Sequence, residues 1–309
     1  RLSDAAFFFA NDKQSPLISR QERLGSVVFQ HHLGSLLDKT HRIVAIAKQL
    51  ADAIGADEAT AVRAAALSKC DLVSEMVLEF PELQGIAGAE YARHDDEPAG
   101  VAEAIEYHYY PRFAGDELPP SPEATAVALA DRLDTLVGIF GIGEPPTGSK
   151  DPFALRRASL AVIRMLINLE KPLSLTELLQ AVVEQHTAEL SPDTPDVVSH
   201  YITERLGNWY DDDGINISVV RAALAAGATD LFDIDLRVRA LNAFAKTETA
   251  EHLAAANKRV ANILAKADNL DGTPADPNLF VHEAEHALHE AISRVGSTLA
   301  PLLADRNYQ

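Results

Sequence analysis

Residues 138–157 read Gly138-Ile-Phe-Gly-Ile-Gly-Glu-Pro-Pro-Thr-Gly-Ser-Lys-Asp-Pro-Phe-Ala-Leu-Arg-Arg157, and this stretch decides how the chain divides. Glycine and proline interrupt helices, so residues 141–149 are the best candidate for a domain boundary. Asp151 followed by Pro152 predicts an N-cap and a first helical position, because a carboxylate accepts hydrogen bonds from free amides and proline has no amide to lose. Three arginines should project from the helix that follows, namely Arg156, Arg157 and Arg164.

The segments on both sides of this loop have helical patterns. Alanine and leucine dominate, β-branched runs are short, and apolar residues recur at spacings of three and four. No strand-like alternation persists, so we predict an all-α chain with two helical domains, residues 1–148 and 149–309. The expected helices cover about 22–54 (broken near Gly34), 57–79, 99–110, 121–139, 152–169, 174–189, 195–210, 215–226, 233–246, 249–267 and 278–302.

The composition limits the classes of protein to consider. The 309 residues include 27 basic and 46 acidic side chains, for a net charge of -19. This excess of acid argues against non-specific binding to nucleic acid, and no DNA partner is expected. A single cysteine excludes an internal disulfide and fits a reducing compartment, and no apolar run approaches the roughly 20 residues of a membrane span. We therefore expect a cytoplasmic protein without membrane contact.

Two basic islands interrupt the acidic chain. Residues 149–172 hold five basic and two acidic side chains, and residues 234–268 hold six and four. In the helix expected at about 249–267, an apolar stripe lies apart from a basic face that carries Lys258, Arg259, Asn262 and Lys266. Such islands suit local contact with a polyanion, and ion pairing within the protein is the alternative.

Several long strings resemble the β subunit family of bacterial glycyl-tRNA synthetase. They follow the family order along the whole chain: Arg1-Leu-Ser-Asp-Ala-Ala-Phe-Phe-Phe9, Leu67-Ser-Lys-Cys-Asp-Leu72, Tyr91-Ala-Arg-His-Asp95, Gly138-Ile-Phe-Gly-Ile-Gly143 with Lys150-Asp-Pro-Phe-Ala-Leu-Arg-Arg157, and Ala254-Ala-Ala-Asn-Lys-Arg-Val-Ala-Asn-Ile-Leu264. The chain opens at Arg1 in mid-pattern, so we expect a piece of a longer β subunit, with the closing helical segment also cut short.

The resemblance implies a subunit of a glycine–tRNA ligase. In this family the α subunit uses ATP and Mg²⁺ to activate glycine, and α and β subunits form a heterotetramer. No catalytic residue and no cofactor are therefore expected in this chain, and its expected partners are the α subunit and tRNA(Gly). The resemblance places residues 149–309 in a helical anticodon-binding-type region. The candidate tRNA contacts are Lys150, Arg156, Arg157, Arg164, Arg237, Arg239, Lys258, Arg259, Asn262 and Lys266.

Residues 20–139 also resemble the HD superfamily, in which a helical bundle binds a metal through histidines and aspartates. The corresponding positions are His41, Cys70, Asp71, His94, His108 and Asp131. Cys70 stands where the histidine of the His-Asp pair belongs, and Lys69 precedes it. A site that lacks a core ligand and has an ammonium neighbour should bind metal poorly. We therefore expect no metal, with Asp71 and Asp131 capping and cross-linking helices.

Two alternative functions remain at this point. A metal-dependent phosphohydrolase on the HD scaffold would need the damaged ligand set to work. A structural module that docks on the α subunit would contact no tRNA. His282-Glu-Ala-Glu-His286 matches the zinc-peptidase pattern, but no sheet precedes it and no clear third ligand follows it, so we favour a solvated helix face.

Overall fold

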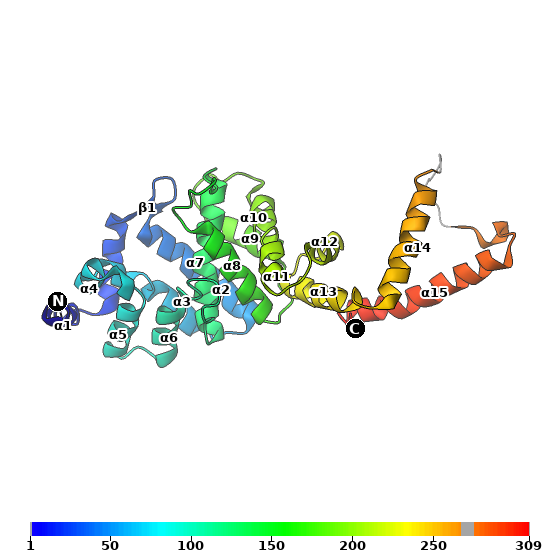
Figure 1. Ribbon diagram of the computed structural model, residues 1–309. Coiled ribbons are helices and arrows are strands. Elements are labelled where there is room, and N and C mark those ends of the chain that lie inside the picture. The colour runs from blue at the N-terminus through cyan, green and yellow to red at the C-terminus, as the bar shows by residue number, and fades with distance from the viewer. Residues whose placement is uncertain (1, 267–274, 309) are drawn as a thin grey trace. The chain divides into compact units, whose positions relative to one another are not determined.

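The computed structural model describes residues 2–266 and 275–308, and these residues are helical nearly throughout (Figure 1). Within these ranges the sole sheet is a two-stranded antiparallel hairpin. The predicted all-α fold is confirmed. No helix in these ranges combines the length and the apolar character needed to cross a bilayer.

The chain forms two compact units, residues 1–209 with 229–232, and residues 210–228 with 233–309. The elements up to the end of the first run are α1 (Leu2–Asp12), η1 (Leu17–Ser26), β1 (Val28–Gln30), β2 (Gly34–Ser35), α2 (Leu36–Ile54), α3 (Glu58–Leu67), η2 (Cys70–Val73), α4 (Glu75–Glu79), η3 (Pro81–Leu83), α5 (Ile86–His94), α6 (Ala99–Tyr107), α7 (Pro122–Gly141), α8 (Leu155–Asn168), α9 (Leu175–Val183), α10 (Thr194–Thr203) and α11 (Leu206–Asp212), which crosses the boundary. The remaining elements are α12 (Ile217–Ala225), α13 (Leu231–Phe244), α14 (Glu248–Leu264), η4 (Pro277–Leu279) and α15 (Glu283–Ala304).

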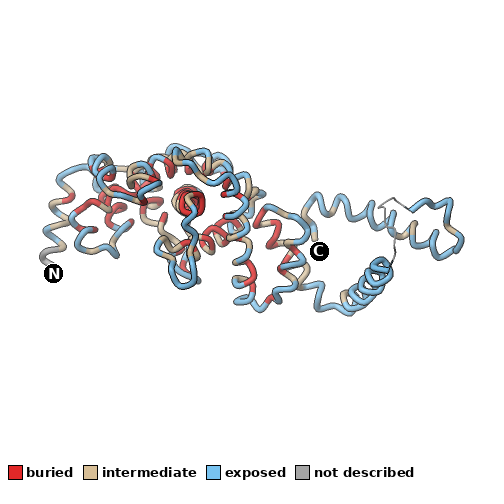
Figure 2. Tube along the Cα trace, turned by 90° about the horizontal axis from the view of Figure 1, so that it is seen from above, coloured by how far each residue is buried: buried red, intermediate tan, exposed pale blue. Residues whose placement is uncertain are grey.

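Helix α7 is the centre of the first unit. Fifteen of its 20 residues are buried, so it presents no solvent face along most of its length. Helices α2, α3, α6, α8, α9 and α10 all pack against it. Figure 2 shows the buried residues, in red, gathered inside this unit. Alanines at 124, 126, 128 and 130 keep this helix narrow, which lets its neighbours approach closely.

The expected helix over residues 22–54 is broken near Gly34, as predicted. A hairpin separates η1 from α2, and Gly34 adopts φ of 87°, which few other residues tolerate. Helix α2 then starts at a capping box in which the Ser35 hydroxyl accepts from the Asp38 amide and the Asp38 carboxylate accepts from the Ser35 amide. This start fixes the direction in which the α2 side chains point.

The predicted start of the helix after the Gly/Pro loop is wrong by three residues. Helix α8 begins at Leu155, not at Pro152, because Ala154 adopts a left-handed φ of 55°. The Asp151 carboxylate still satisfies the free amides at this end, accepting from Leu155 N at 2.8 Å and from Arg156 N at 3.0 Å. The carboxylate therefore caps the helix from further upstream than the sequence suggested.

The expected boundary at residues 148/149 does not separate the compact units, because the residues on both sides of it belong to the first unit. Gly138 and Gly141 lie inside α7, and the segment that contains His186 and Leu190 packs closely against them. A Cβ atom on Gly141 would lie 2.9 Å from the Leu190 Cβ, and one on Gly138 would lie 2.9 Å from the His186 Cε1. These two glycines of the 138–157 stretch therefore allow the residues after α9 to pack directly against α7.

The second unit has a small core and two solvated helices. Tyr210 is buried, and its hydroxyl donates to the Asp235 carboxylate on α13 at 2.8 Å. Helices α14 and α15 bury no residue among those described, although both are amphipathic in sequence. Along α15, five large apolar side chains are between 46% and 63% exposed, namely Leu288, Ile292, Val295, Leu299 and Leu303.

Candidate functional site

The HD-like position is occupied by a charged cluster around Asp131 on α7. The Lys69 ammonium lies 2.8 Å from the Asp131 Oδ2 and 2.9 Å from the His108 Nε2. It also lies 4.1 Å from the centre of the Tyr109 ring, within cation–π range. An ammonium group therefore lies between His108 and Asp131, two of the residues predicted for an HD-type metal site.

A second ammonium completes the cluster from α2. The Lys39 Nζ lies 2.9 Å from the Asp131 Oδ1 and 2.9 Å from the Asp134 Oδ2. The Arg42 Nε donates to the other Asp134 oxygen at 2.5 Å. Asp131 and Asp134 are three residues apart on α7, so both carboxylates face the same neighbouring helix. The result is a buried ion network that joins α2, α7 and the segment before η2.

The electrostatics of the cluster fix the protonation states. Burial would raise the pKa of Asp131, but Lys39 and Lys69 outweigh it and hold that pKa well below its usual range. Burial, helped by the nearby Lys69 charge, lowers the pKa of His108 well below its usual range. His108 is therefore neutral, and its Nδ1–H donates to the Ile105 carbonyl at 2.6 Å while its Nε2 accepts from Lys69.

The other residues of the HD-type set are not brought together. His41 and His94 are exposed on the surface. Cys70 is buried, and its thiol donates to the Ala66 carbonyl at 3.6 Å. Burial raises the pKa of this thiol to about 12, so it stays protonated and is a poor metal ligand. In the described part of the chain, no three side chains of the histidine, cysteine, aspartate and glutamate types converge to hold a metal ion. The donor set does not fit a divalent metal.

Asp71 has a structural position. One carboxylate oxygen, Oδ2, accepts from the Gly85 amide at 2.6 Å and from the Gly88 amide at 3.1 Å, which fixes the start of α5. The other oxygen, Oδ1, is buried and has no hydrogen-bond partner. Burial raises the pKa of Asp71 to about 6, against the effect of these two amides. The predicted capping role of this residue is what the structure shows.

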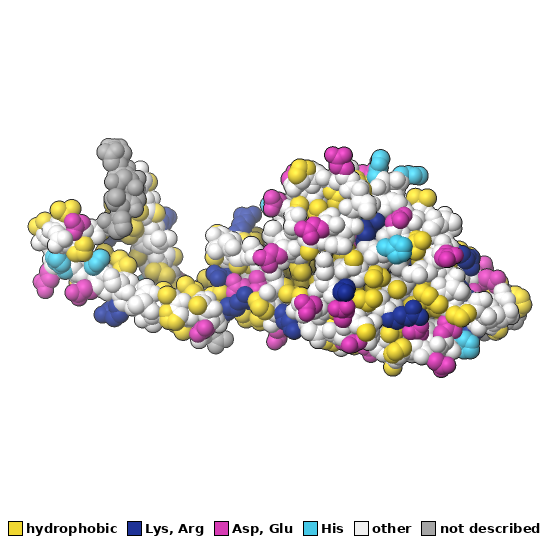
Figure 3. Space-filling view, turned by 180° about the vertical axis from the view of Figure 1, so that it is seen from behind, with side chains coloured by type: hydrophobic (Ala, Val, Ile, Leu, Met, Phe, Trp, Pro, Cys, Tyr) yellow, Lys and Arg dark blue, Asp and Glu magenta, His cyan; other side chains and the backbone are white. Residues whose placement is uncertain are grey.

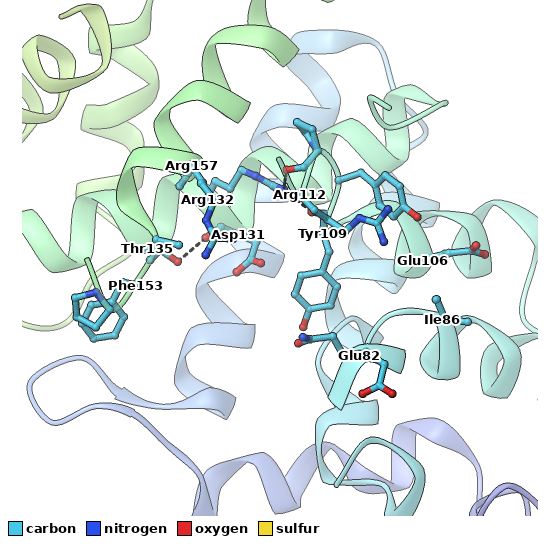
Figure 4. A pocket seen from close by; sticks show the side chains of 16 residues that line it. Glu82, Ile86, Glu106, Tyr109, Arg112, Asp131, Arg132, Thr135, Phe153 and Arg157 are labelled. Atoms are coloured by element: carbon cyan, nitrogen blue, oxygen red, sulfur yellow. Dashed lines mark hydrogen bonds between the residues drawn. The ribbon is translucent and has the colours of Figure 1, made fainter. Parts of the chain in front are cut away.

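An open cavity of about 770 Å³ lies beside the cluster (Figure 4). Its walls come from η3 and α5, from the end of α6 and the segment after it, from α7, and from the first turn of α8 with the residues before it. The lining residues are Glu82, Gln84, Ile86, Glu106, Tyr109, Tyr110, Pro111, Arg112, Asp131, Arg132, Thr135, Pro152, Phe153, Ala154, Arg157 and Ala158. Asp131 and Arg157 were predicted for different sites, and both line this cavity.

The first group of predicted tRNA contacts surrounds the start of α8. Arg156 donates to the Gly148 carbonyl at 2.6 Å, and Arg164 donates to the Asp116 carbonyl at 2.7 Å. Arg157 is exposed and has no carboxylate partner in the described residues. Lys150 is exposed in the loop, where its backbone bridges to Thr147. Two of these cations therefore brace loops, whereas Arg157 and Lys150 keep their side chains available.

The second group is divided in the same way. Arg237 and Arg239 on α13 form ion pairs of 2.8 Å with Asp233 and Asp235, one helical turn earlier. By contrast, the other four predicted contacts are exposed, and none has a carboxylate partner among the residues the structure describes: Lys258, Arg259 and Asn262 on α14, and Lys266, which follows the helix because α14 ends at Leu264 rather than near residue 267. On the face drawn in Figure 3, lysine and arginine side chains lie among aspartates and glutamates.

The zinc-peptidase pattern has a different explanation. His282 is the N-cap of α15, and the Glu285 carboxylate accepts from the His282 and Val281 amides, both at 2.8 Å. This is a capping box. His286 and His289 instead contact the Phe280 ring edge-on. The pattern is explained by the start of a helix.

A family model described as glycyl-tRNA synthetase beta subunit matches residues 1–225. The chain belongs to the glycyl-tRNA synthetase β subunit family. Proteins named glycine–tRNA ligase beta subunit are 49% identical over 309 residues in Chromohalobacter salexigens, 48% over 310 in Mannheimia succiniciproducens and 48% over 309 in Ectopseudomonas mendocina. Each alignment covers 100% of this chain and 45% of the relative, so the chain spans less than half the length of these β subunits.

Within this β subunit family fragment, the sequence reasoning missed three residues of the charged cluster: Lys39, Arg42 and Asp134. A signal for Asp134 was present, because Leu129-Ala-Asp-Arg-Leu-Asp134 places two carboxylates three residues apart in an otherwise apolar helix. Two acids on a buried helix face require buried cations opposite them. No comparable local signal marks Lys39, whose partners lie 92 and 95 residues away.

Proposed function

We propose that this chain is the tRNA-recognition part of the β subunit of a heterotetrameric glycyl-tRNA synthetase. It would position tRNA(Gly) for glycylation by the α subunit, which would supply the ATP and Mg²⁺ chemistry in the cytoplasm. The observation that carries the proposal is the similarity of the whole chain to glycine–tRNA ligase beta subunits. The lysine and arginine side chains on α14 and at the start of α8 support it, because they form no ion pair with a carboxylate in the described part of the chain.

The proposal assigns different parts of the tRNA to the two basic groups. The HD-like region, with Lys150 and Arg157, would lie against the acceptor arm. Helix α14 would approach the anticodon with Lys258 and Arg259, together with Lys266 just after its end, and Asn262 could hydrogen-bond a base or sugar. Arg237 and Arg239 would contribute less, because each already neutralises an aspartate. The net charge of -19 would oppose binding of polyanions elsewhere on the surface.

The test is binding of the chain to tRNA(Gly) and to a non-cognate tRNA over a salt series. Each phosphate contact contributes about 0.7–0.9 to the slope of log K against log salt. The double replacement Lys258→Glu with Arg259→Glu should therefore weaken binding and flatten the slope by roughly 1.4–1.8. Arg221→Glu on α12, an exposed arginine outside the proposed contacts, is the matched control.

A second pair of variants tests the acceptor-arm assignment. Arg156→Glu with Arg157→Glu should weaken tRNA binding, and Arg23→Glu, an exposed arginine on η1, should leave it unchanged. Equal affinity in the double variant and the wild type would remove these arginines from the interface. An absence of binding to either tRNA at low salt would refute recognition by these residues themselves.

The phosphohydrolase alternative finds no support in the cluster. An ammonium lies between His108 and Asp131, and the protonated Cys70 replaces the histidine of the pair. The exposed position of His41 takes a further ligand away from the site.

A further inference from the structure

Helices α14 and α15 each carry an apolar stripe that is exposed to solvent. The α14 stripe has four large side chains that are between 45% and 61% exposed, namely Leu253, Val260, Ile263 and Leu264. On α15 the five side chains from Leu288 to Leu303 described above are exposed to a similar extent. Figure 2 shows both helices exposed along nearly their whole length. Grouped apolar side chains that face water mark an interaction surface.

The two stripes follow the same pattern. Both alternate spacings of three and four residues, which is the arrangement found where two helices meet along a seam. The α15 positions in this alternation are Leu288, Ile292, Val295 and Leu299, and the α14 positions are Leu253, Ala256, Val260 and Ile263. Small residues such as Ala256 and Ala291 lie within or beside the stripes and let a neighbouring helix approach closely. Each stripe can therefore serve as the partner of the other.

Both helices are tied to α13 at one end. Helix α13 ends at Phe244 and α14 begins at Glu248, so a short link joins them. After α15 the chain returns to α13, where the Tyr308 hydroxyl donates to the Asp233 carboxylate at 2.5 Å. The Arg237 guanidinium also lies 4.7 Å from the centre of the Tyr308 ring. Because α14 leads away from α13 and α15 leads back to it, the two helices can pair in antiparallel directions.

We propose that α14 and α15 close on each other as an antiparallel hairpin, with the α14 stripe packed against the α15 stripe. Closure removes both apolar surfaces from water, which is favourable roughly in proportion to the area buried. The shared attachment to α13 makes this encounter intramolecular, so the effective concentration of each stripe at the other exceeds that of a second copy of the chain.

Closure also orients the basic face of α14. Lys258 and Asn262 lie on the side of the helix opposite the apolar stripe, so they face solvent when the stripe is covered. The hairpin thus presents these side chains on a supported helix pair instead of on a single solvated helix. This consequence for RNA binding rests on the proposed function, whereas the closure itself does not.

The experiment is thiol cross-linking of the whole 309-residue chain that carries Ala256→Cys and Ala291→Cys, one thiol near the middle of each helix. A short bismaleimide joins the two thiols and tolerates a shift in register between the helices. The native Cys70 does not compete, because it is buried and burial raises the pKa of its thiol to about 12. The control pair, Ala255→Cys with Ala291→Cys, moves the first thiol to the other side of α14. The stripe pair should cross-link within one chain at least about tenfold faster than the control pair.

Hydrogen exchange tests the same contact without added cysteines. Val295→Asp puts a carboxylate into the α15 stripe and should speed amide exchange in α14 as well as in α15, because the hairpin opens. Ser293→Asp, on the other side of α15, should leave exchange in α14 unchanged.

Three results would overturn the proposal: equal cross-linking rates for the two cysteine pairs, cross-links that join different chains, or unchanged exchange in α14 of the Val295→Asp variant. Cross-links between chains would assign the stripes to a second copy. A cross-linked hairpin in a chain that binds no tRNA(Gly), before or after cross-linking, would count against the proposed function alone.

Discussion

Replacing Asp131 with asparagine should destabilise the first unit by about 3–5 kcal/mol, the range for breaking a buried ion pair from one side. The Asp131 carboxylate lies 2.9 Å from the Lys39 ammonium and 2.8 Å from the Lys69 ammonium, and both lysine side chains are at most 5% exposed. At an effective dielectric constant of about 20, each pair attracts by about 5–6 kcal/mol, much of which offsets desolvation. After the change Lys39 still has Asp134, but Lys69 keeps only the His108 ring nitrogen and the Tyr109 ring. The cost should therefore come mainly from Lys69.

The assay is urea unfolding followed by far-UV circular dichroism, with a double-mutant cycle. Lys69→Met removes the stranded ammonium, so the pair Asp131→Asn with Lys69→Met should cost less than the sum of the single changes, by about 1–3 kcal/mol. Glu58→Gln breaks the exposed pair with Lys48 and should change the free energy of unfolding by at most about 1 kcal/mol. If Asp131→Asn costs no more than this control, or if the two changes are additive, the buried ion network does not stabilise the fold.

Three further outcomes follow from the structure. The pKa of Asp71 is raised to about 6, so protonation of this carboxyl contributes about 3 kcal/mol of stability below about pH 4, and this contribution is lost as pH rises through 6. The difference in unfolding free energy between the wild type and Asp71→Asn should therefore fall between about pH 4 and pH 7. A difference that stays constant over this range would contradict the raised pKa. Gly141→Ala should destabilise the first unit by about 1–3 kcal/mol, because the added methyl group would overpack against Leu190. Gly296→Ala on solvated α15 has open space for its methyl group and should instead stabilise that helix, which increased protection from hydrogen exchange would show. If both changes have the same effect on helix protection, the close contact at Gly141 is refuted. Glu285→Ala should lower hydrogen-exchange protection in the first turn of α15, and Zn²⁺ should not restore it, whereas restoration by Zn²⁺ would return His282 to a metal site.

The sequence predicted the helical class and several helix ends, because those depend on local residues. Alanine and leucine spacing, Gly34 and Asp151 act within a few residues of their own positions. The packing role of Gly141 was not predictable, since it depends on Leu190, which is far along the chain and meets α7 only in the folded unit.

The charged cluster shows why motif positions are harder to place than elements. His41 and Lys39 are two residues apart on α2, which puts their side chains about 200° apart around the helix axis. Because Lys39 points inward to Asp131, His41 must point outward, and it is exposed. A resemblance can place both residues on the right helix, but the direction of each side chain depends on the register of the whole helix.

The ammonium groups of Lys39 and Lys69 are covalent parts of the chain, whereas the cation of a metal site must be acquired after synthesis. Each copy of this protein therefore carries its helix-joining charge from the moment it is translated. At the Asp131 cluster a chelator therefore has no cation to remove and a competing ion has none to displace, because both cations are side chains. The same arrangement also gives up the Lewis acidity and ligand exchange that a bound metal ion offers. The ion network between α2 and α7 is thus completed by side chains of the chain itself.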